Sequence, residues 1–511
     1  MGSEISPYYD SLLLKVTTWD NTFQGVCLKA GRAIREIHIR GVKTNIAFIS
    51  NILQNPTFLA GGCHTKFIDE TPELFELNEG QDRATKMLKY IGNIVVKERD
   101  GHKMYDPCRF PPVTGNRPDG LKQMLDAKGP KAVADWVLGQ KKLLICDTTC
   151  RDAHQSLLAT RVRTRDIVKG MEGTSEILAD AFSLECWGGA TFDVAYRFLH
   201  ESPWERLDLI REKAPNLLLQ MLLRGANAVG YTNYPDNVIR EFIKEAARSG
   251  IDVFRIFDSL NWIPGMEVAM DEVLKQDKIC QATICYTGDI LDPRRDKYDL
   301  KYYVDMAKEL AAAGANIIAI KDMAGLLKPE ASYRLVSALK DAVDLPIHLH
   351  THEGSGNAIY TYARAVDAGV DIVDTAMSAM SCGTSQPSGS SLYYALSGHP
   401  RQPRVDVDAM NELSRYWETV RPYYKAADQT ELFPNPEVYV HEMPGGQYTN
   451  LKQQATALGL IERWEEVKDM YHRVSMMFGD LIKVTPSSKI VGDMALFMVQ
   501  NDLSEEDIYA K

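Results

Sequence analysis

Two kinds of hydrophobic pattern alternate through the middle of the chain. Short runs rich in apolar and β-branched residues recur, and longer stretches with helical spacing of apolar positions separate them. The eight short runs lie at residues 143–149, 182–188, 217–225, 252–260, 281–288, 316–325, 346–353 and 371–380. Because strands buried on both faces have such runs, the pattern predicts eight parallel strands joined by helices.

The number of these units indicates one closed barrel. Parallel strands with helical crossovers form either an open doubly wound sheet or a (β/α)8 barrel. The eight units occupy about 240 residues and neither stop nor reverse at a midpoint, which matches the size of the barrel. We therefore expect an α/β fold with a (β/α)8 TIM barrel over residues 141–400, and the doubly wound sheet is the alternative.

The segments on either side of the barrel have other patterns. Residues 1–75 predict a small α+β region, and residues 76–140 predict a polar, partly helical connector. Residues 401–511 predict a helical extension that is broken by Gly/Pro turns such as "EMPGGQY". The total of 511 residues agrees with more than one domain.

Composition and charge exclude several classes of function. The net charge of -11 argues against a general nucleic-acid binder, because a polyanionic partner demands a basic surface. No apolar run approaches the roughly 20 residues that span a bilayer. The 9 cysteines are scattered, and an odd number favours reduced thiols and the cytosol. The sequence thus predicts a cytoplasmic protein with neither a nucleic-acid nor a membrane partner.

Polar side chains gather where five of the predicted strands end. The carboxyl ends of the strands form the rim on which (β/α)8 barrels assemble their active sites. In "PIHLHTHEGSG", His350 and His352 alternate along a strand, so they point to the same side. Neutral imidazoles bind Zn or Mn, and Asp152 beyond the first strand offers a carboxylate. This pattern indicates a metal site. Histidines that are only hydrogen-bonded within a strand would have the same spacing. His348 lies deeper in the barrel and is expected to be structural.

Lys321 is unusual because it lies inside the apolar strand "NIIAIKDMAG". Burial disfavours the ammonium form, so a lysine there tends to lose its charge. A neutral amine at a barrel mouth can form a Schiff base, or it can take up CO2 as a carbamate that binds a metal. Alternatively the side chain keeps its charge and reaches solvent or pairs with Asp322. The residues alone leave these interpretations open.

Further polar residues of the rim are candidates for holding a substrate. Arg151 and Arg224 could each bind a carboxylate through two parallel hydrogen bonds. Gln155 could donate an amide hydrogen bond to a carbonyl oxygen. Asp193 and Tyr231 fit a hydrogen-bonded network in the site, and they fit ordinary cap and turn positions equally well.

Longer segments of the chain resemble the pyruvate carboxylase family. From about residue 140 to 511 the likeness is to its carboxyltransferase domain, in segments such as "DTTCRDAHQSLLATRVRT", "ECWGGATFDVAYRFLHESPWERL", "MLLRGANAVGYTNYPDNV", "KDMAGLLKP", "DTAMSAMSCGTSQPS" and "KVTPSSKIVGDMA". Upstream, "REIHIRGVKTNIAFISNIL" resembles the last part of the family's biotin carboxylase domain. "QDRATKMLKYIGN" resembles the start of its allosteric, tetramerisation region.

The resemblance implies a metal centre and a reaction. Asp152, His350, His352 and a carboxylated Lys321 match the ligands of a divalent metal, Zn or Mn. In the reaction that the family catalyses at this site, carboxybiotin releases CO2 and the enolate of pyruvate attacks it to give oxaloacetate. The chain departs from the expected "HTHDTSG" at Glu353 and Gly354, which could alter hydrogen bonds around the ligands.

The resemblance also implies roles for residues outside the metal centre. Arg224 and Gln155 match the residues that bind the carboxylate and carbonyl groups of pyruvate. Thr485 matches the residue that shuttles a proton between the methyl group of pyruvate and biotin. The residues that match the supporting network of the pyruvate and biotin pockets are Arg151, Asp193 and Tyr231.

Several expectations concern partners. The sequence contains neither an ATP-binding Gly-rich domain nor an "AMKM" biotin-attachment motif, so the resemblance implies a truncated chain limited to the carboxyl-transfer half-reaction. Biotin would then come free or on a biotin carrier domain, and the barrel would form a homodimer that belongs to a tetramer in the full enzyme. In some bacterial members cyclic di-AMP stacks on paired tyrosines between two barrels, and Tyr333 and Tyr360 match them, unless both are ordinary surface aromatics.

Three other functions stay open. One is the carboxyltransferase subunit of an oxaloacetate decarboxylase or a transcarboxylase, which shares the barrel motifs. Another is a barrel aldolase or acyl-condensing enzyme, whose Asp and His ligands would bind metal without a carboxylated lysine. The third is an inactive dimerisation or regulatory module.

Overall fold

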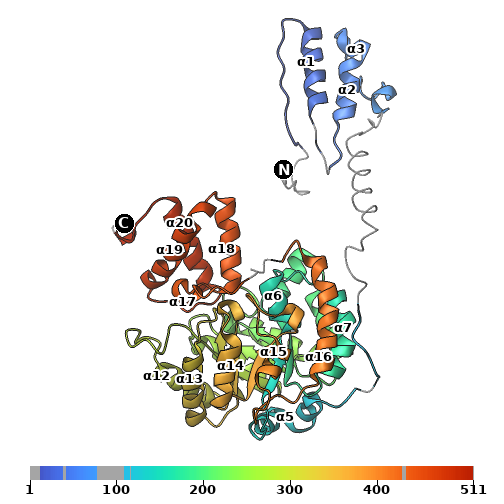
Figure 1. The fold of residues 1–511 in the computed structure, drawn as a ribbon. Helices are drawn as coiled ribbons and strands as arrows, with labels where there is room; N and C mark the ends of the chain where they lie inside the picture. Colours follow the sequence, from blue (N-terminus) through green and yellow to red (C-terminus); the bar gives the residue numbers. More distant parts are fainter. Residues whose placement is uncertain are drawn as a thin grey trace. The chain divides into compact units, whose positions relative to one another are not determined.

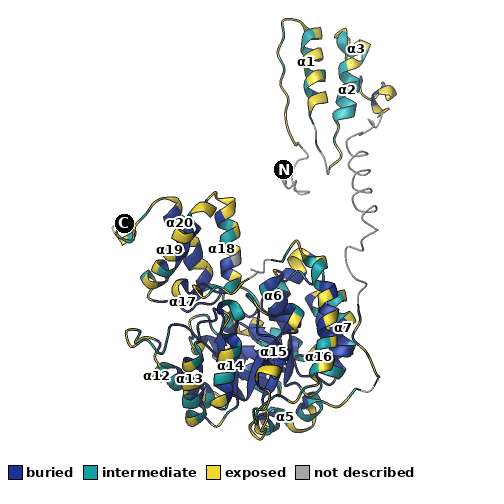
Figure 2. Ribbon diagram, in the orientation of Figure 1, coloured by how far each residue is buried: buried dark blue, intermediate teal, exposed yellow. Residues whose placement is uncertain are grey.

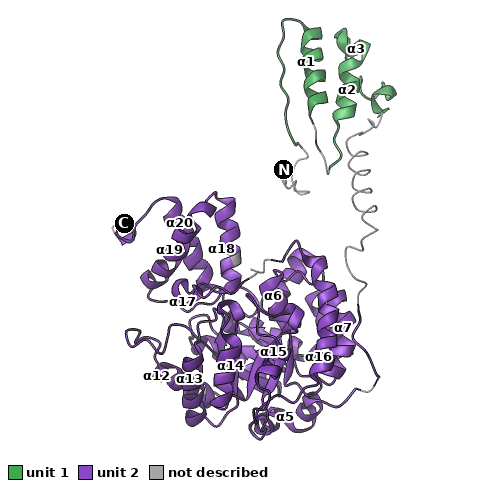
Figure 3. Cartoon of the chain, in the orientation of Figure 1, with its two compact units in different colours: residues 1–104 green, residues 105–511 purple. Residues whose placement is uncertain are grey.

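The computed structural model describes residues 12–37, 39, 42–76, 109–115, 117–428 and 433–509. The chain divides into two compact units, Met1–Met104 and Tyr105–Lys511 (Figures 1 and 3). No helix among these described residues is both long enough and apolar enough to cross a membrane.

All eight predicted strands are present and close into one parallel barrel. They are β1 (Leu144–Asp147), β2 (Ser183–Gly188), β3 (Leu219–Leu223), β4 (Val253–Ile256), β5 (Ile279–Cys285), β6 (Ile317–Asp322), β7 (Ile347–Thr351) and β8 (Ile372–Thr375). Each strand pairs with the next along the chain, and β8 pairs with β1 through Leu144 and Ile372. This last pairing confirms the (β/α)8 barrel and rules out the doubly wound sheet.

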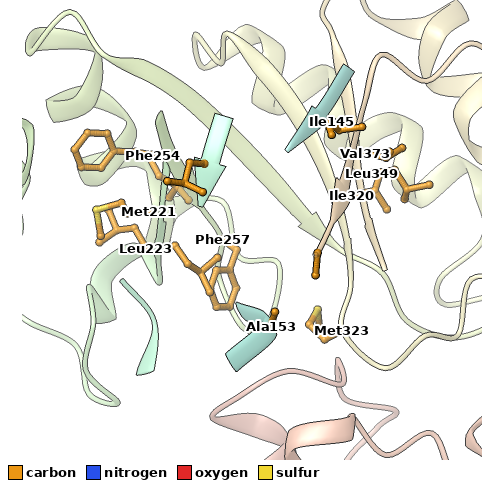
Figure 4. Close-up of a cluster of buried hydrophobic side chains, with 14 of the residues drawn as sticks. Ile145, Ala153, Met221, Leu223, Phe254, Phe257, Ile320, Met323, Leu349 and Val373 are labelled. Carbon is orange, nitrogen blue, oxygen red and sulfur yellow. The ribbon is translucent and has the colours of Figure 1, made fainter. Parts of the chain in front are cut away.

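A ring of helices covers the outside of the barrel and buries one continuous apolar core against it (Figure 2). The main helices of this ring are α7 (Thr164–Ile177), α9 (Pro203–Lys213), α10 (Asp236–Arg248), α11 (Pro264–Lys275), α12 (Leu300–Ala312), α13 (Pro329–Ala342), α14 (Ala358–Asp367) and α15 (Gly389–Ala395). The strand residues of this core include Ile145, Phe254, Ile320, Leu349 and Val373 (Figure 4). Because side chains alternate along a strand, the neighbours of these residues face the barrel interior.

Helix α5 (Leu121–Leu138) packs on the end of the barrel where the strands begin. Its apolar residues, such as Leu125 and Val137, join one buried cluster with Phe182, Leu218 and Ile317 from the starts of three strands. Part of the expected connector over residues 76–140 therefore contributes to the core of the barrel unit. Helix α5 therefore covers the end of the barrel where the strands begin. The loops at the opposite end, the carboxyl rim, can form a site.

The expected helical extension is confirmed. Helix α16 (Val407–Val420) packs on the barrel, where Met410 and Trp417 join the main core. A second apolar core, which includes Leu451, Val467 and Val491, holds together the helices that follow. They are α17 (Val438–His441), α18 (Gly445–Ala457), α19 (Trp464–Met477), α20 (Ser487–Gln500) and α21 (Glu505–Tyr509).

The first unit contains α1 (Phe23–Glu36), α2 (Ile46–Gln54) and α3 (Pro56–Leu59). Thr22 caps α1, because its hydroxyl accepts a hydrogen bond of 3.0 Å from the backbone N–H of Gly25. In the described stretches of this unit the regular elements are helical, so strands of the expected α+β region are not seen there. Most of the expected connector, residues 77–108, lies outside the described residues.

The close approach of β2 and β3 depends on Gly188. This residue has a φ of +82°, and a Cβ atom on it would lie 2.3 Å from the carbonyl oxygen of Leu222. We expect Gly188→Ala to lower the free energy of unfolding by roughly 2–4 kcal/mol, through backbone strain and a displaced strand. Denaturant unfolding measures this change. The control is Gly446→Ala on α18, where a Cβ atom would meet nothing within 4 Å; equal stability of both variants would contradict the account.

Candidate metal centre and substrate pocket

The barrel interior holds a layer of buried charged side chains. The guanidinium of Arg255 on β4 pairs with Asp374 on β8 and, at 3.2 Å, with Glu185 on β2. His348 Nε2 lies 2.6 Å from Asp374 Oδ1, so His348 belongs to this layer, as its deeper position predicts. These side chains are fully buried, and burying such charges is tolerated only when they are paired. Sequence reasoning missed Arg255, Glu185 and Asp374, although each is a charged residue inside an apolar strand.

Three of the predicted metal ligands converge next to this layer. His350 is the second-last residue of β7, His352 lies just beyond the strand, and Asp152 lies in the helical turn Thr149–Ala153 that follows β1. The Nε2 atoms of the two histidines are 3.0 Å apart. Asp152 Oδ2 is 3.4 Å from His350 Nε2 and 3.5 Å from His352 Nε2. All three side chains are buried, and their ligand atoms lie within 4.8 Å of one another.

Hydrogen bonds fix the orientation of both imidazole rings. His350 Nδ1 donates to Asp374 Oδ2 at 2.6 Å, and His352 Nδ1 donates to the carbonyl oxygen of Thr384 at 2.6 Å. Because the carbonyl and the ionised carboxylate can only accept, the neutral rings carry their proton on Nδ1 and a lone pair on Nε2. Burial chiefly keeps the pKa of each histidine below its usual value, which favours the neutral ring. The two Nε2 atoms, each with a lone pair, are 3.0 Å apart, an arrangement that suits one cation bound by both nitrogens.

Lys321 joins the same cluster. Its Nζ atom lies 3.2 Å from His350 Nε2, and burial chiefly lowers the pKa of this lysine. The alternative in which Lys321 pairs with Asp322 is wrong, since the two side chains leave the strand on opposite faces. Asp322 instead accepts hydrogen bonds from the backbone N–H groups of Leu326 and Leu327 at 2.8 and 2.9 Å. Burial also excludes a side chain that reaches solvent, so the Schiff base and the carbamate stay open.

The carboxylate of Asp152 is held from two sides. Arg151 Nη1 donates to its Oδ1 at 2.6 Å, and Gln386 Nε2 donates to its Oδ2 at 2.7 Å. Burial raises the pKa of Asp152, but the charges of Arg151 and Lys321 outweigh this effect and hold the pKa well below its usual range. Sequence reasoning missed Gln386, which lies in "GTSQPS" beyond β8 and could be found only through the likeness of this segment to the family.

Arg151 is fully buried and links the ligand cluster to the charged layer. Its Nε atom donates to Glu185 Oε1 at 2.7 Å, in addition to its bond with Asp152. Both contacts place Arg151 in a supporting network. A direct grip of Arg151 on a substrate carboxylate stays a prediction.

The predicted pyruvate-binding residues lie along the same rim. Arg224 is buried, and its Nη1 donates to the carbonyl oxygens of Val229 and Gly230, each at 3.1 Å. Its guanidinium lies 5.1 Å from the ring centre of Tyr231, a half-exposed residue. Burial chiefly lowers the pKa of Arg224; the nearby charge of Arg151 lowers it further, and that of Asp193 raises it.

Gln155 and Asp193 flank this part of the rim. Gln155 Oε1 accepts a hydrogen bond of 3.2 Å from the backbone N–H of Ala190. A Cβ atom on Gly189 would lie 3.2 Å from that oxygen and 3.6 Å from Arg151 Nη1, so glycine leaves room for both side chains. Asp193 on α8 (Ala190–Val194) pairs with Arg197 at 3.2 Å.

Three predicted residues lie away from the ligand cluster. Thr485 lies in the helical extension, just before α20, and the described contacts do not join it to the ligands. Tyr333 on α13 and Tyr360 on α14 are exposed on neighbouring helices of the outer ring, and the guanidinium of Arg364 lies 4.3 Å from the Tyr333 ring centre.

The departures at Glu353 and Gly354 lie beside the ligands. Glu353 is largely buried, which raises the pKa of its carboxyl group, and its Oε1 accepts from the backbone N–H of Ala358 at 3.3 Å. A Cβ atom on Gly354 would meet nothing closer than 3.8 Å. The Nδ1–H of His352 is held by Thr384, so neither departure takes part in that bond.

Asp374 orients His350, so its replacement tests the geometry of the cluster. We expect Asp374→Asn to weaken metal binding by about 10- to 100-fold, as the loss of a charged partner behind a histidine ligand typically does. Competition with a chelator measures the affinity. Asp371→Asn is the matched control, because Asp371 precedes β8 at its opposite end and pairs with Lys340. Equal affinities of the two variants would contradict a role of Asp374 in holding the ligand.

Comparison with known proteins first places the chain in a class. The HMGL-like model matches residues 291–416 of the barrel, and the model of a conserved carboxylase domain matches residues 438–511 of the extension, so the fold is that of a carboxylase barrel. The model of the biotin carboxylase C-terminal domain matches residues 1–70.

Individual relatives then define the family. The chain is 57% identical over its whole length to the pyruvate carboxylase of Bacillus subtilis and 49% identical to the mitochondrial pyruvate carboxylase of Homo sapiens, and covers 45% and 44% of these proteins. A solved structure of the carboxyl transferase domain of Rhizobium etli pyruvate carboxylase matches with 55% identity and a TM-score of 0.78, over 84% of this chain and 73% of that one. The chain belongs to the pyruvate carboxylase family, and it spans about half the length of the curated relatives it matches.

Proposed function

We propose that the barrel carries out the carboxyltransferase half-reaction of pyruvate carboxylase, in which the carboxyl group of carboxybiotin moves to pyruvate and gives oxaloacetate. The observation that carries this proposal is the convergence of Asp152, Lys321, His350 and His352 at the carboxyl rim. Structures of the related Rhizobium etli domain with pyruvate and with oxamate and biotin support it.

The four converging side chains would hold a divalent metal, Zn or Mn. Two neutral imidazoles, one carboxylate and an oxygen of a carbamate on Lys321 suit either ion. The lowered pKa of Lys321 favours the neutral amine that adds to CO2. A carbamate and Asp152 together carry two negative charges, which balance a divalent ion. The bound ion would supply positive charge close to the oxygens of the substrate.

The remaining rim residues would bind and activate pyruvate. Arg224 would pair with its carboxylate, and the amide N–H of Gln155 would donate to its carbonyl oxygen. Negative charge grows on that oxygen as the enolate forms, so donors and cations held in place beforehand stabilise it most in the transition state. Arg151 and Asp193 would keep these groups in position, and Tyr231 would lie against Arg224.

Thr485 would move the proton. Pyruvate loses a proton from its methyl group as the enolate forms, and biotin gains a proton when it gives up its carboxyl group. A hydroxyl both donates and accepts, so Thr485 can take the first proton while it delivers its own to biotin. The enolate carbon then attacks the released CO2.

The other candidate functions are less well supported. The match of residues 1–70 to the biotin carboxylase C-terminal domain favours pyruvate carboxylase over a separate decarboxylase or transcarboxylase subunit. The match of residues 438–511 to the carboxylase model favours a carboxylase over an aldolase or acyl-condensing enzyme. The expected metal-ligand residues are all present and lie close together, which disfavours an inactive dimerisation module.

The reverse reaction tests the proposal without the rest of the enzyme. Purified chain, loaded with Zn or Mn, is incubated with oxaloacetate, and the release of pyruvate is followed with and without free biotin. We expect biotin to stimulate the decarboxylation. A chain that holds its metal but shows no stimulation by biotin would overturn the proposed function.

The proposed partners include a second copy of the chain and a nucleotide. We also propose a homodimer through the barrel, a biotin carrier domain as a partner and a cytoplasmic location. Cyclic di-AMP would stack on Tyr333 and Tyr360, whose exposed rings lie on adjacent helices. Calorimetry with cyclic di-AMP tests this site. If the wild-type chain gives no heat of binding, cyclic di-AMP is excluded as a ligand.

A further inference from the structure

A ring of four charged side chains joins the barrel to the helical extension. Arg295 lies in the loop between β5 and α12, whereas Glu442, Asp480 and Lys483 belong to the extension. Arg295 pairs with Glu442, and its Nη2 atom lies 3.0 Å from Asp480 Oδ2. Lys483 Nζ lies 3.0 Å from Glu442 Oε2 and also pairs with Asp480. Each cation of this charge cluster therefore contacts both carboxylates.

The members of the charge cluster depend on one another because they are shielded from water. Glu442, Asp480 and Lys483 are buried, and Arg295 is largely covered. Burial raises the pKa of Glu442, but its hydrogen bond to Arg295 and the charge of Lys483 hold the pKa below its usual value. A buried charge that loses its partner is strongly unfavourable, so the removal of one cation would loosen the contact as a whole.

The backbone at both carboxylates is strained. Glu442 and Asp480 have φ values of +56° and +55°, a region that non-glycine residues seldom adopt and that persists where surrounding contacts enforce it. The loop after β5 also holds the turn at Asp480 directly. The Tyr298 hydroxyl donates to the carbonyl oxygen of Asp480 at 2.8 Å, and Lys297 Nζ donates to that of Gly479.

The fixed turn at Asp480 leads within five residues to Thr485. Ile482 and Val484 anchor the intervening chain in the apolar core, and the Ser487 hydroxyl lies 2.7 Å and 2.6 Å from their two carbonyl oxygens. The loop that holds Asp480 leaves the carboxyl end of β5, which is the rim that carries the metal ligands. Arg295 is therefore one of the contacts that tie the segment before Thr485 to that rim.

We infer that Arg295, through Glu442 and Asp480, is a positioning residue for Thr485 and so for proton transfer. This inference rests on the proposed function. Arg295 is not placed on the substrate or the metal, so its loss should slow turnover without weakening either binding step. A displacement of about 1 Å in a reacting group costs about 10²-fold in rate.

The test compares Arg295→Gln with Arg294→Gln in the full chain. Arg294 is the adjacent, exposed arginine and pairs with Asp292. In Arg295→Gln we expect faster hydrogen exchange of the amides of residues 481–485 and a fall of about 10- to 10²-fold in biotin-stimulated kcat. The KM for oxaloacetate and the metal content should not change. Arg295→Lys should recover part of the rate, and Arg294→Gln should match the wild type in every measurement.

Two results would overturn the inference. One is unchanged exchange and unchanged kcat in Arg295→Gln. The other is a loss of rate that comes with a loss of metal or of overall protection from exchange, which would show a general effect on folding. The exchange measurement needs no turnover: if the wild type lacks biotin-stimulated activity, the proposed function fails, and exchange still decides whether Arg295 holds the segment of Thr485.

Discussion

Lys321→Ala is expected to lose most of the bound metal and, with it, biotin-stimulated decarboxylation. The substitution removes the amine that lies 3.2 Å from His350 Nε2 and so removes the carbamate oxygen as a ligand. Loss of a hydrogen bond that supports a metal ligand typically weakens metal binding by roughly 10- to 100-fold, and loss of the ligand itself should weaken it at least as much. Metal analysis of the purified variant, beside the rate assay, measures both effects.

Lys328→Ala is the matched control for this variant. Lys328 follows β6 on the same rim, but it is partly exposed and pairs with Asp289 at 2.6 Å. It should keep the metal and the rate of the wild type. Growth with isotopically labelled bicarbonate should place the label on Lys321 and not on Lys328. Full metal content in Lys321→Ala would refute the carbamate as a ligand and leave Asp152, His350 and His352 as the metal site.

Thr485→Ala is expected to keep its metal and lose its turnover. The hydroxyl lies outside the ligand cluster, so the metal content should equal that of the wild type. Loss of a positioned proton donor and acceptor costs typically 10²- to 10⁴-fold in rate. Parallel metal analysis and decarboxylation assays separate this effect from that of Lys321→Ala.

Thr485→Ser is the control that keeps a hydroxyl at the same position. It should retain much of the rate, whereas Thr485→Ala should not. Normal turnover by Thr485→Ala would show that another group moves the proton. The inferred role of Arg295 in proton transfer would then have no target, although its effect on the segment of residues 481–485 could persist.

The sequence was sufficient to predict the barrel because the signal is local. Each strand is a short apolar run, such as "NIIAIKDMAG", and Gly or polar residues mark its ends. Alternation along β7 was enough to place His350 and His352 on one side. The position of a residue at the end of a strand then places it on the rim, which is how Asp152 and Lys321 could be assigned to the same site.

The groups behind the ligands could not be predicted in this way. Arg255 and Asp374 pair across 119 positions of sequence, and Gln386 reaches Asp152 across 234. Each is a single polar residue whose partner is known only once the barrel has closed. The proton positions of the imidazoles are set by such partners, so the state of His350 as a ligand depends on Asp374 and could not be read from its spacing.

The charge cluster was missed for a related reason. Arg295 lies in a polar loop with other charged residues, and Arg294 beside it has the same side chain with no contact to the extension among its described pairs. The two arginines differ in their tertiary contacts, because Glu442 and Asp480 lie next to Arg295 only in the folded chain. A local pattern gives no sign of such a ring.

The central claim is that one metal ion lies among Asp152, Lys321, His350 and His352. An anomalous-scattering map from crystals of the full chain, recorded across the Zn and Mn absorption edges, tests it most directly. The account predicts a single peak bounded by Asp152 and the Nε2 atoms of His350 and His352, with carbamate density on Lys321. A map without a peak there, from protein shown to contain stoichiometric metal, would contradict it.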